Sequence, residues 1–194
     1  MLFCSIIVLS LGFYSFSQTD PMLVNRLAKY TQAIHLLNAE KVLDFIYPPF
    51  FAIVPKQDIL GAFETKTDMF SLHADSLKTD SIYPIFVLQN ASYAKVNCTM
   101  KYIMEVKFPS DKTIAEKKET VNDPQLLLSL KTRFKADYIM TDKENNIYIY
   151  LRAPLVAIKD EFAKEWSFVG IDENDPVTIK LFSKEILDKL ATYK

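Results

Sequence analysis

The chain has 194 residues, 49% of them hydrophobic and 24% charged, which suits one domain with its own core and excludes a disordered protein. Its 23 basic and 24 acidic residues leave a net charge of −1, so we expect no nucleic-acid partner. Only 3 glycines accompany 14 Phe and 10 Tyr, which disfavours Gly-rich loops that cradle nucleotides.

An apolar leader opens the chain. The run at residues 2–17 is shorter than the ~20 residues of a membrane span, and Ser15 and Ser17 provide the small residues of a cleavage site. We therefore predict a signal peptide over residues 1–17, an exported protein that is periplasmic or secreted, and no stable membrane span after cleavage. A retained anchor is the alternative, because the positive residues of a typical signal peptide are missing.

Two helices are predicted next. Asp20 is a suitable N-cap and Pro21 suits the first helical position. Apolar residues then recur at a spacing of three and four along one stripe, at Leu23, Leu27, Tyr30, Ile34 and Leu37. Asn38 can end this helix and cap the second, which must stop near Tyr47 because a residue before proline disfavours the α region.

An aromatic corner follows, and we expect the rest of the chain to be organised around it. Residues 47–51 are Tyr-Pro-Pro-Phe-Phe, in which two prolines exclude a central strand and two phenylalanines are unsuited to a solvated loop. We predict an extended corner whose rings pack against the fold and close its wide end. A third helix should start at Pro55 and carry Ile59, Leu60, Phe63 and Phe70.

From about Ser81 the apolar period changes to two, which indicates strands. Residues 92–108 form one long predicted strand with a buried face that includes Cys98, and the loss of alternation after Lys101 predicts a bulge. Cys98 would be a buried, inert thiol without a disulfide partner, because Cys4 lies in the leader.

The second half combines one helix with further strands. Residues 110–119 are charged and are predicted to be a loose connection, whereas Asp123 and Pro124 start a helix over residues 123–136. Strands are predicted over 137–141, 146–159 and 165–171, and a short final helix after Ser183.

The strand at 146–159 has two different faces, since Tyr148, Tyr150 and Arg152 alternate with aliphatic residues. If the tyrosines and the arginine faced inward, they would form a pocket suited to an anion or a carbohydrate. If they faced outward, they would form a dimer face, because Tyr and Arg are enriched at interfaces. We expect the aliphatic face to point inward, because the core needs it.

This order of elements resembles the NTF2-like superfamily of cone-shaped α+β proteins. The likeness rests on residues 38–48, on Phe50-Phe51 and on residues 55–60; residues 157–160 and 166–168 resemble exported, uncharacterised members from Bacteroidetes-type bacteria. It implies one domain over residues 18–194, with N-terminal helices packed on a strongly bent antiparallel sheet and a cavity between them. The helix near 123–136 is an addition to that plan.

The resemblance implies a ligand site in the cone cavity. We expect Tyr30, Tyr47, Phe50, Phe51 and Trp166 to bind the ligand. No catalytic residue is transferred, because the acid–base sets of the isomerases and cyclases of the superfamily do not map onto this chain. With 2 histidines and no calcium-loop glycine after Asp142, we expect neither a metal site nor a cofactor.

Three functions follow from these expectations. The first is an exported protein that binds a small apolar or amphipathic molecule, or a peptide, without catalysis. The second is an isomerase- or cyclase-type enzyme that uses a carboxylate in the cavity. The third is a structural or assembly module that forms a homodimer through its sheet. The fold alone does not choose among them.

Overall fold

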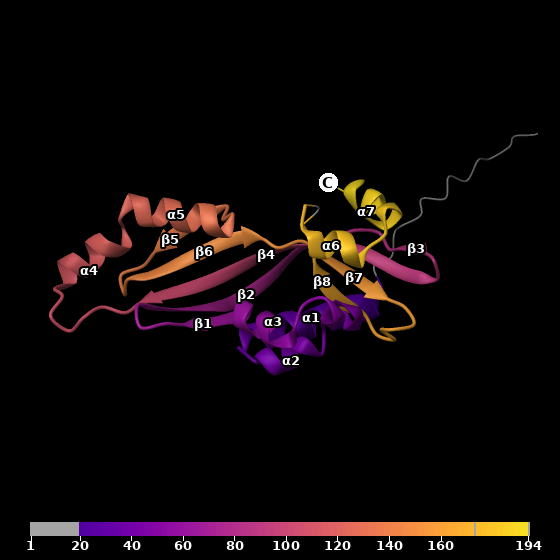
Figure 1. Cartoon of the computed structure of the whole chain (residues 1–194), viewed down its shortest axis with the longest axis horizontal. Coiled ribbons are helices and arrows are strands. Elements are labelled where there is room, and N and C mark those ends of the chain that lie inside the picture. Colours follow the sequence, from indigo (N-terminus) through magenta and orange to yellow (C-terminus); the bar gives the residue numbers. More distant parts are fainter. Residues whose placement is uncertain (1–19, 173, 194) are drawn as a thin grey trace, which may run out of the picture.

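The computed structural model describes residues 20–172 and 174–193, so the predicted signal peptide lies outside the described residues. Within that part, eight antiparallel strands form one open sheet, and seven α-helices pack against it (Figure 1). The predicted α+β class, with N-terminal helices on an antiparallel sheet, is therefore confirmed.

The predicted caps begin the helices. The side chains of Asp20, Asn38, Asp123 and Ser183 each accept a backbone N–H in the first turn of the following helix. The helices are α1 (Pro21–His35), α2 (Ala39–Leu43), the 3₁₀ helix η1 (Pro48–Ala52), α3 (Lys56–Phe63), α4 (Ile114–Val121), α5 (Pro124–Phe134), α6 (Pro176–Leu181) and α7 (Lys184–Ala191).

The long strand β4 organises the sheet. The strands are β1 (Glu64–Lys66), β2 (Phe70–Ile82), β3 (Phe86–Leu88), β4 (Ala91–Val106), β5 (Tyr138–Thr141), β6 (Asn146–Arg152), β7 (Leu155–Lys159) and β8 (Ser167–Gly170). One edge of β4 pairs with β2 and β3. The other edge pairs with β7 along its first half and with β6 along its second half; β5 extends β6 and β8 extends β7.

The prediction that Phe70 belongs to the third helix is wrong, because α3 ends at Phe63 and Phe70 opens β2. The predicted bulge in β4 after Lys101 is also wrong. The register shifts lie in its partner β2, where Asp75 and Asp80 are extra residues opposite a regular β4.

Three other segments differ from the prediction. Residues 110–119 were expected to be a loose connection, but Thr113 and Glu116 form a capping box that starts α4. The predicted strand over 146–159 divides into β6 and β7 at Ala153 and Pro154, because proline donates no ladder hydrogen bond. Asp175 caps α6, a helix that the sequence pattern did not predict.

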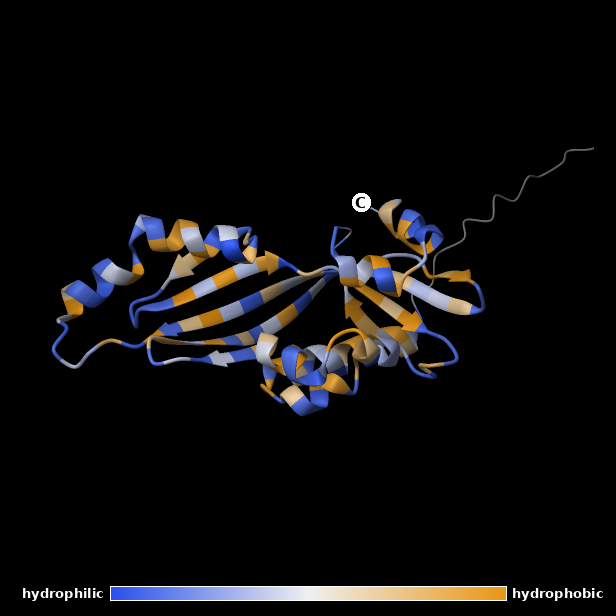
Figure 2. Cartoon of the chain, in the orientation of Figure 1, coloured by the Kyte–Doolittle hydropathy of each residue, from blue (hydrophilic) through white to orange (hydrophobic). Residues whose placement is uncertain are grey.

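Three hydrophobic clusters make the core. The first lies between α1, α2 and the middle of the sheet; the second joins α6 and α7 to β4, β7 and β8; the third joins α4 and α5 to β6 and the far end of β4. In Figure 2, hydrophobic and hydrophilic residues alternate along β4 and β6, whereas β7 is mostly hydrophobic.

Strand β4 twists strongly between the first and third clusters. Met100 faces the first cluster and Met104 the third, although residues four apart lie on the same face of a strand. Figure 1 shows α1–α3 on one side of the paired strands β2 and β4, and α5 on the other side. The bulges at Asp75 and Asp80 lie in this region, and bulges increase the right-handed twist of a sheet.

Candidate functional site

The aromatic corner is fixed to the edge of the sheet. The N–H of Phe168 donates to the carbonyl of Phe45 at 2.7 Å, and the N–H of Tyr47 donates to the carbonyl of Phe168 at 3.2 Å. The corner itself is the 3₁₀ helix η1, not the predicted extended segment, since the fixed φ of Pro48 and Pro49 also suits a helical turn.

The residues predicted to bind a ligand do not share one cavity. Tyr30 is 5% exposed and its ring lies 5.2 Å from that of Phe168, within the first cluster. Phe50 and Phe51 are half-buried against the same cluster. The hollow between α1, α2, α3 and β2 measures about 30 Å³, so packed side chains fill the space in which the cone cavity was expected.

Tyr47 and Trp166 instead reach two separate shallow hollows. Tyr47 borders one of about 560 Å³, and its hydroxyl donates to Oδ2 of Asp160 at 2.5 Å. Trp166 borders one of about 340 Å³, and its Nε1–H donates to Oδ2 of Asp20 at 2.8 Å. Burial, followed by the bond to Asp160, raises the pKa of Tyr47, so this phenol stays protonated.

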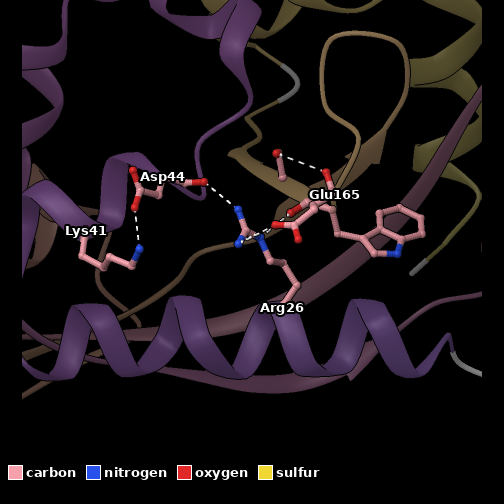
Figure 3. Close-up of polar contacts among 6 residues, drawn as sticks. Arg26, Lys41, Asp44 and Glu165 are labelled. Carbon is pink, nitrogen blue, oxygen red and sulfur yellow. Dashed lines mark hydrogen bonds and ion pairs between the residues drawn. The ribbon is translucent and has the colours of Figure 1, made fainter.

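Arg26 of α1 contacts residues near both Tyr47 and Trp166 (Figure 3). Its Nη2 donates to the carbonyl of Asp44 at 2.7 Å and its Nε to the carbonyl of Trp166 at 3.1 Å. Its Nη1 pairs with Glu165 at 2.8 Å, and its guanidinium lies 4.4 Å from the centre of the Phe45 ring. These contacts tie α1 to the end of α2 and to the segment before β8, which is a structural role.

A groove of about 1050 Å³ crosses the middle of β4. We call it the β4 groove. Its residues come from three segments far apart in sequence: Lys95, Asn97 and Thr99 of β4; Phe134, Lys135, Asp137 and Tyr138 between α5 and β5; and Ile171, Asp172 and Asn174 after β8. Asp80 of β2, Cys98 of β4, Leu151 and Arg152 of β6, and Pro154 complete it. Figure 1 shows the end of α5 and the start of α6 on either side of this part of the sheet.

The charges of the β4 groove are paired with one another. Lys135 binds Asp172 at 2.8 Å, an ion pair that joins the α5 side of the groove to the β8–α6 side. Arg152 binds Asp137 at 3.2 Å. The hydrogen bond from Lys135 lowers the pKa of Asp172, so this carboxylate is held ionised and is a poor general acid.

The remaining polar groups on β4 also have partners. Thr99 donates its hydroxyl to Oδ2 of Asp80 at 2.7 Å. Nζ of Lys95 donates to the carbonyl of Tyr193 at 2.5 Å, just after the end of α7. The side chain of Asn97 donates to the hydroxyl of Tyr83 at 3.2 Å. Each of these three polar side chains of the β4 groove is therefore satisfied by another group of the chain.

Other reactive groups lie apart from the β4 groove or are chemically quiet. His35 is exposed near the carbonyl of Asp75, and His73 is half-buried on β2. Cys98 is buried as predicted, and burial raises the pKa of its thiol to about 12. Among the described residues, no His, Cys, Asp and Glu side chains gather in groups of three or more that could hold a metal ion.

No protein-family model, no curated protein and no solved structure matches this chain. The described helices are also too short or too polar for any of them to span a bilayer.

Sequence patterns could have located only part of the β4 groove. Alternation along the predicted strand separates Lys95, Asn97 and Thr99 from the buried face, so a polar surface there was foreseeable. Ile147 and Ile149 are fully buried, which confirms the aliphatic face of β6 as the inward one and leaves Arg152 outward. The turn after β8 carries no signal that would bring Asp172 beside Lys135.

Proposed function

We propose that this chain is an exported NTF2-like protein that binds a small amphipathic molecule or a peptide in the β4 groove without catalysing a reaction. The observation that carries this proposal is the size and lining of that groove. Its volume of about 1050 Å³ compares with the ~300–1,000 Å³ of typical ligand clefts. In this proposal the twisted, open sheet with α1–α3 on one side is a variant of the NTF2-like cone.

The lining of the β4 groove supports an amphipathic ligand. Phe134, Leu151, Pro154 and Ile171 offer apolar surface, and Asn97 and Thr99 offer hydrogen-bonding groups. Mixed linings of this kind orient a ligand through a few polar groups while burying its apolar part. The packed interior beneath α1–α3 offers a hollow of only about 30 Å³, so we assign the ligand to the β4 groove instead.

Native mass spectrometry of the protein purified from its own cell envelope tests the proposal. We expect a mass that corresponds to a chain starting at Gln18, together with a non-covalent adduct. Thr99→Trp should abolish the adduct because the bulky new side chain projects into the middle of the β4 groove and obstructs the ligand. Ile103→Trp, on the same face of β4 but outside the groove, should keep it. An adduct that survives Thr99→Trp contradicts the assigned site, and an unprocessed chain contradicts cleavage of the predicted signal peptide.

An enzyme of the isomerase or cyclase type is the alternative, and the Tyr47–Asp160 pair favours it. A carboxylate in hydrogen-bond reach of a tyrosine beside a hollow of about 560 Å³ meets the geometric requirement for acid–base work. However, Oδ1 of Asp160 also accepts the N–H groups of Phe162 and Ala163, which holds the β7–β8 turn. Deuterium exchange into a cyclic ketone that is lost in Asp160→Asn would favour the enzyme.

The third alternative is a homodimer through the outward face of β5 and β6. Tyr138 and Met140 are 48% and 54% exposed there, and Tyr138 stacks on Tyr150 with ring centres 4.3 Å apart. Tyrosine and methionine are enriched at protein interfaces. Sedimentation at high concentration tests this alternative, and a monomer there would rule it out.

A further inference from the structure

We infer that the ligand of the β4 groove is a neutral carbohydrate, an inference that rests on the proposed function and specifies the ligand class. A sugar ring is an amphipathic ligand, because its C–H groups form apolar patches and its hydroxyls both donate and accept hydrogen bonds. The β4 groove matches each of these properties, in its charges, its aromatic rim and its apolar walls.

The charge arrangement favours an uncharged ligand. Lys95, Lys135 and Arg152 are balanced by Asp80, Asp137 and Asp172 in the lining. Lys135 and Arg152 already bind Asp172 and Asp137, and Lys95 binds a backbone carbonyl. A charged ligand would have to compete with these partners, whereas a neutral ligand leaves them in place.

The paired groups still offer hydrogen bonds to hydroxyls. Arg152 uses Nε for Asp137, and the guanidinium carries five N–H donors, so its remaining donors can reach a ligand. The Arg152 side chain is 84% exposed, which leaves it accessible. Asn97, Thr99 and Asn174 add short polar side chains that can act as both donors and acceptors.

Tyr138 supplies an aromatic surface at the rim. One face of its ring stacks on Tyr150, with centres 4.3 Å apart and planes 15° apart, and this contact fixes the ring orientation. The side chain lines the groove and the residue is half exposed, so the ring is available to the C–H face of a sugar. A pre-oriented ring of this kind gives contact area at low entropic cost.

Titration calorimetry against neutral oligosaccharides of glucose, mannose and N-acetylglucosamine tests the inference. We expect one of them to bind, with an affinity that changes little between low and high salt because a neutral ligand gains nothing from Coulomb attraction. Tyr138→Ala should weaken binding about tenfold through the loss of ring contact, whereas Tyr138→Phe should retain it. Met140→Ala, an exposed change on the same strand outside the groove, should have no effect.

Two further probes separate this inference from the proposed function. The tripeptide Ala-Ala-Ala and lauric acid are titrated into the same protein and into Thr99→Trp. One outcome would keep the β4 groove as a ligand site but overturn the carbohydrate assignment. In that outcome the tripeptide or lauric acid binds, Thr99→Trp abolishes this binding, and no oligosaccharide binds. If an oligosaccharide binds and Tyr138→Ala leaves its affinity unchanged, the assigned contact is wrong. If no probe binds and no adduct accompanies the purified protein, both proposals fail.

Discussion

At the scale of single residues, Asp20 shows how one side chain secures both a helix and the only tryptophan. Its Oδ1 accepts the N–H of Met22 at 2.8 Å and caps α1, while its Oδ2 accepts Nε1–H of Trp166 at 2.8 Å. These bonds, with that of Trp166 the larger cause, lower the pKa of Asp20 below its usual range. The cap was predicted from the sequence, but its link to Trp166 was not, because nothing in the pattern relates residues 146 positions apart.

We predict that Asp20→Ala lowers the free energy of unfolding by about 1–2 kcal/mol, because it removes the cap and leaves the indole N–H without its acceptor. Urea denaturation followed by Trp166 fluorescence measures this. Because the pKa is lowered in the folded state, the contribution of Asp20 is complete above the unfolded pKa and is lost as the pH falls through the folded pKa. In Asp20→Asn the free energy of unfolding should therefore fall less steeply as the pH is lowered. Asp68→Ala, at an exposed loop position, should change stability by less than ~0.5 kcal/mol.

At the scale of elements, the bulges explain why the sequence predicted β4 well and missed β2. Buried and less buried positions of β4 alternate regularly over residues 94–100. In β2 the extra residues Asp75 and Asp80 change the spacing of inward positions, so that Ala74 is followed by Leu77 instead of by residue 76. A spacing of three disguises a strand as a helix. Phe70 lies before both bulges, and its prediction as helical has a different cause, since it follows Phe63 at a helical spacing of seven residues. Helices α1, α5 and α7 were predictable because their apolar spacing is regular and each begins at a clear N-cap residue.

We predict that deleting Asp75 is tolerated better than deleting His73. Removal of the bulged residue restores regular alternation, because Ala74 and Leu77 keep their inward positions. It reduces the local twist and removes the half-buried ion pair with Lys101, so we expect a loss of about 0.5–2 kcal/mol in the free energy of unfolding. Deletion of His73 shifts the register by one, turns Phe70 and Leu72 outward and should cost about 3 kcal/mol or more. Midpoints of urea unfolding compare the two, and equal losses would contradict the bulge assignment.

At the scale of the whole molecule, the arrangement of helices on the twisted sheet decides where the β4 groove lies. The sequence predicted helices on an antiparallel sheet, but not that α4 and α5 would lie on the side opposite to α1–α3 (Figure 1). That arrangement leaves a stretch of β4 uncovered between α5 and α6, and the β4 groove lies there. Because its walls come from residues about 40 and 75 positions after Lys95, no local pattern could have predicted it.

The first and third clusters are joined by few side chains, and we predict that Tyr102 couples their unfolding. Tyr102 packs against both clusters, and its ring centre lies 6.1 Å from that of Phe134 in α5. In the unmodified chain, Trp166 fluorescence and far-ultraviolet circular dichroism should therefore report one transition in urea. Tyr102→Ala leaves a cavity at the junction and should cost about 3–5 kcal/mol.

The decisive observation in Tyr102→Ala is the order in which the circular dichroism and Trp166 fluorescence signals change as urea rises. Tyr102 and Leu151 both pack against the first and the third cluster, and this variant removes the larger of these two contacts. We therefore expect α4 and α5 to unfold at lower urea and to reduce the helical signal before Trp166 responds. Phe134→Leu, which alters the same contact from the α5 side while keeping an apolar side chain, should shift the midpoint less and keep the transitions together. Coincident transitions in Tyr102→Ala would show that the sheet, through the continuous backbone pairing of β2, β4 and β6, couples the two ends without this side chain.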